Sequence, residues 1–106
     1  MIAVVLERGA AWNPEVPFAE QAGFAAHVAL ISGLLSSGVA IEAGPFSDPA
    51  VRTNDKLVAL ALLDFESVEE AEDVFARDPM VAESVVALHV HPWGGQPLQR
   101  EEETRP

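Results

Sequence analysis

The sequence predicts a single α+β domain in which two helices cover one face of a four-stranded antiparallel sheet. Three observations lead to this prediction. Short apolar stretches typical of strands alternate with two stretches of helical periodicity. Glycine and proline separate these stretches. The chain has 106 residues, which is the usual size of one domain.

The chain begins with a strand followed by a helix. Residues 2–7 (IAVVLE) are apolar on both alternations, as in a strand that is buried on two faces. Between residues 18 and 36 apolar side chains recur every three or four positions, which predicts an amphipathic helix. Gly38 is expected to end this helix in the left-handed conformation. Gly23 and Gly33, inside it, are expected at points of close packing.

Two more strands and a second helix follow. Residues 39–46 (VAIEAGPF) predict a strand that the Gly-Pro step ends, and residues 56–65 (KLVALALLDF) predict a third strand, again apolar on both alternations. Ser67 and Glu70 have the spacing of a capping box, which marks the start of a helix. Pro79 marks the end of that helix, because proline cannot continue the hydrogen-bond ladder.

A brief turn over 79–84 leads to the last strand, residues 85–93 (VVALHVHPW). The resulting order is β-α-β-β-α-β, the split arrangement of ferredoxin-like domains. Two helices can cover only one face of the sheet, yet the first and third strands are apolar on both. We therefore expect a second copy of the sheet to cover the other face, in a two-fold homodimer or a higher assembly.

Composition excludes several classes of function. The chain has no cysteine, so it has no disulfide, thiolate metal site or cysteine nucleophile. A net charge of −11 without a cluster of Lys and Arg makes nucleic acid and anionic membranes poor partners. No apolar run has the length of a membrane span, and the N-terminus lacks the basic region of a signal peptide, which predicts a cytoplasmic protein. No cofactor motif is present, so no cofactor is predicted. The domain is predicted to span residues 1–93, and residues 94–106 are predicted to form a polar C-terminal tail.

Three histidines and a few carboxylates are the side chains that could carry chemistry. His27 lies on the apolar helix, where packing at the edge of a core is the commoner role of a histidine. His89 and His91 share one face of the last strand and could chelate a metal, although such pairs often occur by chance and their spacing fixes no third ligand. Asp78 precedes Pro79, and the end of a helix explains this step most simply.

A pattern of short segments runs over nearly the whole chain up to Trp93. Its parts are the opening strand, His27-Val28-Ala29-Leu30, Gly38, Ala43-Gly44-Pro45-Phe46, Ser67-Val68-Glu69-Glu70-Ala71, Asp78-Pro79 and His91-Pro92-Trp93. In order and spacing this pattern resembles the YCII-related (YciI-like) domain family. Two features depart from the family: Met80 stands where phenylalanine is common, and no basic residue accompanies His27. The second departure speaks against a substrate that needs a positive charge beside His27.

The resemblance implies a ferredoxin-like homodimer of the dimeric α+β barrel kind. It also implies an active site in which His27 and Asp78 form a His-Asp dyad. His27 would act as the general acid or base, and Asp78 would fix its tautomer. The candidate substrate-binding residues are Pro45, Phe46, Met80, His89 and Trp93. Characterised members of the family include an enzyme that eliminates chloride from a hydroxylated aromatic ring.

Three hypotheses follow. The first is a lyase or isomerase without a cofactor that transfers a proton on a cyclic or aromatic small molecule. The second is a non-catalytic dimeric module for small-molecule binding or an accessory role, because polar site residues are few. The third is a metal-assisted site at His89 and His91, which has the least support in the sequence, so no metal is predicted.

Overall fold

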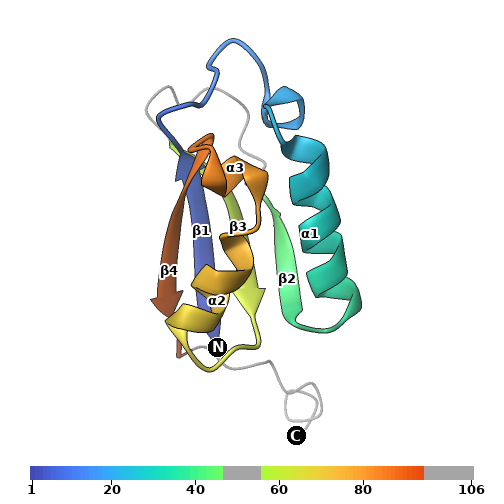
Figure 1. The fold of residues 1–106 in the computed structure, drawn as a ribbon. Helices are drawn as coiled ribbons and strands as arrows, with labels where there is room; N and C mark the ends of the chain where they lie inside the picture. Colours follow the sequence, from blue (N-terminus) through green and yellow to red (C-terminus); the bar gives the residue numbers. More distant parts are fainter. Residues whose placement is uncertain (47–55, 95–106) are drawn as a thin grey trace, which may run out of the picture.

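The computed structural model describes residues 1–46 and 56–94 (Figure 1). In chain order, its elements are β1 (Ile2–Arg8), the 3₁₀ helix η1 (Phe18–Glu20), α1 (Phe24–Ser36), β2 (Ala40–Pro45), β3 (Leu57–Leu63), α2 (Val68–Phe75), α3 (Pro79–Ala82) and β4 (Val86–Pro92). The four strands have the order β2-β3-β1-β4, and all neighbours are antiparallel. The predicted α+β fold with its βαββαβ order is therefore confirmed. The predicted polar tail lies, apart from Gly94, outside the described residues.

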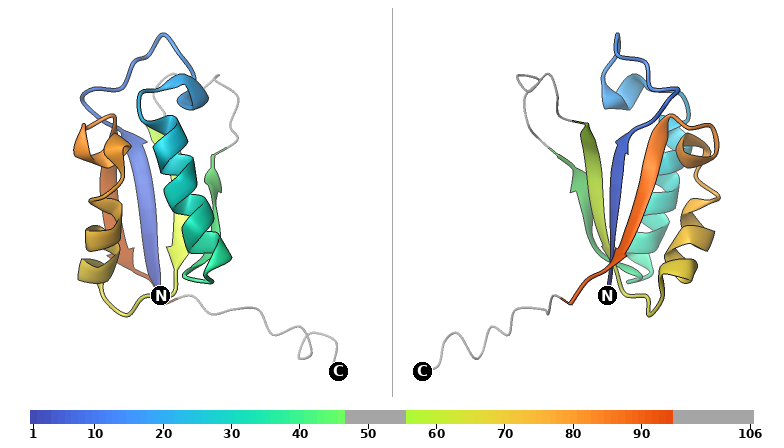
Figure 2. Two further views of the ribbon diagram at one scale, coloured as in Figure 1. Left: turned by 45° about the vertical axis from the view of Figure 1, so that its right-hand side comes forward. Right: turned by 90° about the vertical axis from the view of Figure 1, so that its left-hand side faces the viewer.

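The core lies between the sheet and the helices, which cover one of its faces (Figure 2). Helix α1 packs along β2, while α2 and α3 pack against β4. Ile2, Val4 and Leu6 point from β1 into the core, and each pairs with another buried residue of β3. Phe75 and Met80 are fully buried on the helical side. Burial of one such side chain contributes about 1.5–3 kcal/mol, so this layer holds the helices on the sheet.

The helix predicted over residues 18–36 is in fact two elements. Gly23 has φ +85° and precedes the first residue of α1, so it separates η1 from α1 rather than lying inside one helix. A Cβ atom at Gly23 would lie 3.2 Å from Cγ of Met80, which confirms the close packing expected there. Around Gly33 a Cβ would meet no atom within 4 Å, so the close packing expected at that glycine is wrong.

The predicted helix ends are otherwise present. Gly38 follows α1 with φ +82°, the left-handed conformation expected of it. Ser67 and Glu70 form the predicted capping box at the start of α2. The segment predicted as a turn after Asp78 contains the short helix α3, with Asp78 as its N-cap and Pro79 at its first position, where the missing N–H of proline costs nothing.

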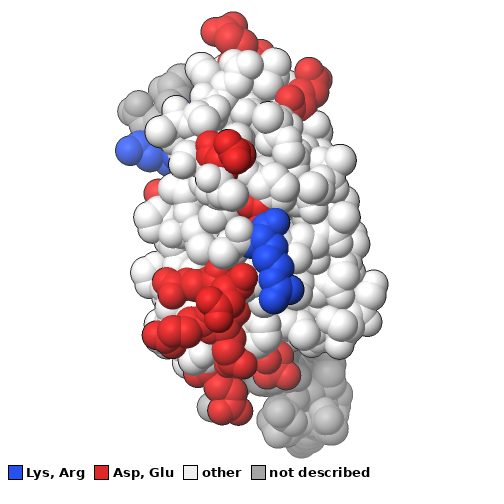
Figure 3. All heavy atoms as spheres, viewed as in Figure 1, with Lys and Arg blue, Asp and Glu red and all other residues white. Residues whose placement is uncertain are grey.

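Acidic side chains gather over α2 on the outer surface of the helical layer (Figure 3). The helix itself carries Glu69, Glu70, Glu72 and Asp73. Two of these lie in its first turn, where negative charge interacts favourably with the positive end of the helix dipole. A surface of this charge repels phosphate backbones. No helix in the described part of the chain is long and apolar enough to cross a membrane.

The other face of the sheet, here called the open face, is largely apolar, and no helix among the described residues covers it (Figure 2). Its central residue is Val5 of β1, which pairs with Leu60 of β3 and His89 of β4. Near one edge, Nε2 of His89 lies 3.1 Å from Oε1 of Glu7. The sheet thus carries apolar side chains on both faces, as the alternation in the sequence predicts.

Candidate active site between α1 and the sheet

His27 and Asp78 meet in the interior, although 51 positions separate them in the chain. Nδ1 of His27 lies 2.5 Å from Oδ2 of Asp78. His27 is 5% exposed and Asp78 is completely buried. The other carboxylate oxygen, Oδ1, accepts a hydrogen bond of 2.9 Å from the backbone N–H of Met80. One aspartate therefore caps α3 and holds the histidine at the same time.

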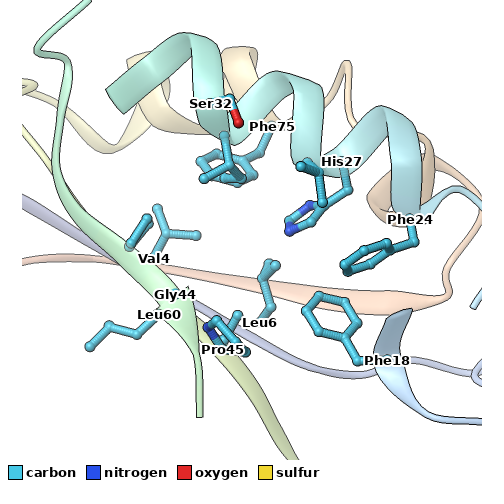
Figure 4. Close-up of a pocket in the computed structure, with 15 residues that line it drawn as sticks. Val4, Leu6, Phe18, Phe24, His27, Ser32, Gly44, Pro45, Leu60 and Phe75 are labelled. Atoms are coloured by element: carbon cyan, nitrogen blue, oxygen red, sulfur yellow. The ribbon is translucent and has the colours of Figure 1, made fainter. Parts of the chain in front are cut away.

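The aspartate determines which nitrogen of His27 is available for chemistry. A carboxylate oxygen accepts hydrogen bonds, so Nδ1 is the nitrogen that donates to Asp78. Among residues 1–46 and 56–94, Nε2 has no hydrogen-bond partner. The His27 ring extends from α1 toward the sheet, into the space shown in Figure 4. This arrangement leaves Nε2 as the nitrogen that can exchange a proton with a bound molecule.

The space beside His27 is an apolar cavity of about 200 Å³ between α1 and the sheet. Its lining residues are Val4, Leu6, Phe18, Phe24, His27, Val28, Ile31, Ser32, Ala43, Gly44, Pro45, Ala59, Leu60, Ala61 and Phe75. Among these residues only His27 and Ser32 have polar side chains, and none is Asp, Glu, Lys or Arg. An apolar cavity of about 150 Å³ can hold benzene, so the space suits one aromatic or cyclic ring.

Two phenylalanines form the wall of the cavity next to His27 (Figure 4). The ring of Phe18 lies edge-on to that of Phe24, with centroids 4.9 Å apart, and its centroid is 5.6 Å from that of His27. The Trp12 ring stacks behind Phe18 at 6.1 Å. The sequence pattern indicates none of Phe18, Phe24 and Ser32 as a site residue, because Phe24 belongs to the apolar stripe predicted over residues 18–36. The position of Phe24, three residues before His27 on one helix, was an available signal. Phe18 and Ser32 had no such signal in the sequence.

The residues predicted to bind substrate lie in different places. Pro45 lines the cavity of His27. Phe46 lines a more open hollow beside β2 and β3 instead. Met80 is fully buried and offers the site only its backbone N–H. His89 lies on the open face, and Trp93 follows β4, where it is 46% exposed. The structure brings His27 and Asp78 into contact and places Pro45 in the lining of the cavity. Phe46, Met80, His89 and Trp93 are not among the described residues that line it.

The pair of histidines on β4 does not form part of a metal cluster in the described residues. No group of three or more His, Asp or Glu side chains within residues 1–46 and 56–94 is arranged to hold a metal ion. Nε2 of His89 lies 3.1 Å from Oε1 of Glu7 instead. The hypothesis of a metal-assisted site therefore gains no support from the structure.

Comparison with known proteins places the chain in a family. The sequence model of the YCII-related domain matches residues 8–94. No match is found among curated proteins. Among solved structures, the chain is similar to the 5-chloro-2-hydroxyhydroquinone dehydrochlorinase TftG from Burkholderia phenoliruptrix AC1100, in complex with 2,5-dihydroxybenzoquinone. The TM-score is 0.62 and the sequence identity is 18%. The alignment covers 91% of this chain and 96% of that chain. This likeness supports the fold, and the match over residues 8–94 shows that the chain belongs to the YCII-related domain family.

Proposed function

We propose that the protein is a small lyase or isomerase that moves a proton on a cyclic or aromatic molecule bound in the cavity of His27. The observation that carries this proposal is the orientation of His27. A buried carboxylate holds Nδ1, while Nε2 is left without a partner among the described residues, next to an apolar cavity. A positioned imidazole of this kind is the usual general acid or base at neutral pH.

In the proposed reaction, Nε2 of His27 accepts a proton from a hydroxyl group or an acidic C–H of the bound ring. Asp78 stabilises the imidazolium that forms. In an elimination from a chlorinated hydroquinone, the ring first tautomerises, which moves one hydroxyl proton to the carbon that bears chlorine and leaves a carbonyl group. Nε2 then takes the proton of a second hydroxyl group, whose electron pair forms a second carbonyl group, and chloride leaves with the C–Cl electron pair. The net change is loss of HCl, and the product is a quinone. In an isomerisation, the same nitrogen returns the proton to another atom. Neither step consumes an oxidant or a reductant.

The lining of the cavity favours an uncharged ring. Among the described residues that line it there is no Lys or Arg, so an anionic substrate would lose its hydration without gaining a fixed positive partner from them. The dehydrochlorinase with the same fold acts, by its name, on a chlorinated hydroxyhydroquinone. Halogenated hydroquinones are therefore the first substrates to test, with unsaturated cyclic lactones as the second group.

We expect the protein to release chloride from 5-chloro-2-hydroxyhydroquinone or a related chlorohydroquinone, measured by ion chromatography against a sample without protein. The sparse polar lining also supports the alternative of a non-catalytic binding module, because only two of the described residues that line the cavity have polar side chains. That alternative predicts binding of hydroquinones without release of chloride and without conversion of any lactone. Catalysis is excluded for these substrates if binding is observed and no product forms.

We further infer that a second copy of the chain covers the open face. Val5 and Leu60 lie near its centre, and the contact between Nε2 of His89 and Oε1 of Glu7 lies near one edge. A two-fold axis would place the apolar side chains of the two copies against each other. A large apolar sheet face is rarely left in water.

The substitution Val5→Lys is expected to convert the dimer into a monomer, because it would bury a charge at the centre of the interface without a partner. Sedimentation velocity measures the change. The matched control is Ala29→Lys, which places the same charge on the exposed side of α1 and should leave the dimer intact. A wild-type protein that sediments as a monomer at all concentrations would contradict this inference.

A further inference from the structure

Gln21 is a buried polar residue that the proposed reaction does not use. It lies between η1 and α1 and is 5% exposed. Its side-chain amide makes three hydrogen bonds, all to the backbone of the segment before η1. Oε1 accepts from the N–H of Asn13 at 2.9 Å, and Nε2 donates to the carbonyl oxygens of Asn13 at 2.7 Å and Val16 at 2.9 Å.

These hydrogen bonds require an amide at this position. An amide offers an acceptor and two donors, and Gln21 uses all three functions at once. Glutamate would lack both donors, and methionine would lack all three. Either substitution would leave backbone groups of Asn13 and Val16 without their partner, which favours release of the segment into water. Gln21 thus acts as a clamp on the loop that connects β1 to η1.

The clamped loop leads directly into the aromatic wall of the cavity. Phe18 follows two residues after Val16, whose carbonyl oxygen accepts a hydrogen bond from Gln21. The ring of Phe18 contacts the rings of both Phe24 and His27. Figure 4 shows its ring at the Phe24 end of the cavity, away from Ser32. Phe18 does not belong to α1 or to the sheet. Its position against His27 therefore depends on the loop, and the loop is held by Gln21.

We propose that Phe18 is a specificity-determining residue of the His27 cavity and that Gln21 is the positioning residue that holds it there. The ligand class this selects is a planar, uncharged aromatic ring. The face and edge of Phe18 favour a flat ring placed against Nε2 of His27, because aromatic rings attract one another beyond the burial of area alone. A saturated ring of the same size gains no such contact. This ligand class rests on the proposed function, in which a ring bound in the cavity exchanges a proton with His27.

The test uses hydroquinone as a planar probe without a leaving group and cyclohexane-1,4-diol as its saturated counterpart. Affinities are measured by NMR titration of the full chain under nitrogen, and the position of Phe18 is followed by the nuclear Overhauser effect between its ring and that of His27. The variants are Phe18→Leu, Gln21→Met and the double variant. Glu15→Ala is the control, because Glu15 lies in the same loop with an exposed side chain and, among the described residues, only its backbone N–H makes a hydrogen bond there.

We expect the wild type to bind hydroquinone more tightly than the diol. Phe18→Leu and Gln21→Met should each weaken hydroquinone binding by about 2- to 10-fold, the size of one aromatic contact, and leave the diol nearly unchanged. Gln21→Met should also lose the Phe18–His27 contact while the Phe24–His27 contact stays. Because Gln21 acts through Phe18, the double variant should bind no more weakly than Phe18→Leu. Glu15→Ala should match the wild type.

Additive losses in the double variant, or a Phe18–His27 contact that survives in Gln21→Met, would overturn the role of Gln21. Equal affinity of the wild type for both probes, or no binding of hydroquinone, would overturn the selection of a planar ring. If Gln21→Met does not fold, Gln21→Glu takes its place, since it keeps the acceptor and the length. Selective binding of hydroquinone without turnover of any chlorohydroquinone would leave this inference standing and reject the proposed catalysis.

Discussion

Replacement of His27 by glutamine is expected to lower kcat by about 10²- to 10⁴-fold, the usual contribution of a general acid or base. Glutamine has a similar reach and can still accept a hydrogen bond in the cavity, but it cannot take up a proton at neutral pH. The measurement is the initial rate of chloride release, or of whichever turnover the substrate screen identifies. Hydroquinone binding should change far less than kcat, because the aromatic wall remains.

The matched control for this variant is His91→Gln. His91 lies on β4 and pairs with Ala3 on the open face, so the same chemical change is made away from the cavity. Its kcat should stay close to that of the wild type. Equal activity of His27→Gln and the wild type would show that His27 does not transfer the proton, and the non-catalytic alternative would then lead.

Asp78→Ala is expected to cost about 2–4 kcal/mol in the free energy of unfolding. Loss of the N-cap of α3 accounts for about 1 kcal/mol. A further 1–3 kcal/mol, roughly, comes from the buried Nδ1–H of His27, which would have no acceptor. Urea unfolding at a fixed protein concentration measures the loss, because a dimer would make the midpoint depend on concentration.

Ser67→Ala provides the comparison for Asp78→Ala. It removes the N-cap of α2, whose hydrogen bonds lie at an exposed position, and it leaves no buried group without a partner. We expect it to cost only about 1 kcal/mol. If both variants lost the same stability, Asp78 would be a helix cap alone, and its bond to His27 would contribute nothing to the fold.

Much of the fold can be predicted from the sequence because burial follows the periodicity of the strands and helices. The alternation of β1 and β3 predicts strands with two apolar faces, and the Ser67–Glu70 spacing predicts the start of α2. The division of the first helix could not be predicted in this way. The apolar stripe is continuous across Gly23, and only the backbone angle of that residue shows that the chain leaves the helical path.

Less of the site than of the fold can be predicted from the sequence. His27 and Asp78 belong to separate elements, and no periodicity rule indicates that α1 and the start of α3 meet; the pairing came from the family resemblance. Side chains at strand ends are also difficult to assign. Phe46 and Trp93 follow the last residues of β2 and β4, where the alternation that determines the facing of a side chain stops. Phe18 depends on a loop that Gln21 holds, and loop geometry has no pattern in the sequence.

The orientation of His27 is the central claim, and NMR of its ring nitrogens tests it most directly. Long-range proton–nitrogen correlation spectra of the wild type distinguish a protonated Nδ1 from a protonated Nε2, with His27→Gln for assignment and Asp78→Asn for comparison. At mildly alkaline pH we predict that the proton stays on Nδ1, that Asp78→Asn weakens this preference, and that hydroquinone shifts the signal of Nε2. A proton on Nε2 in the wild type, with no response to hydroquinone, would contradict the account.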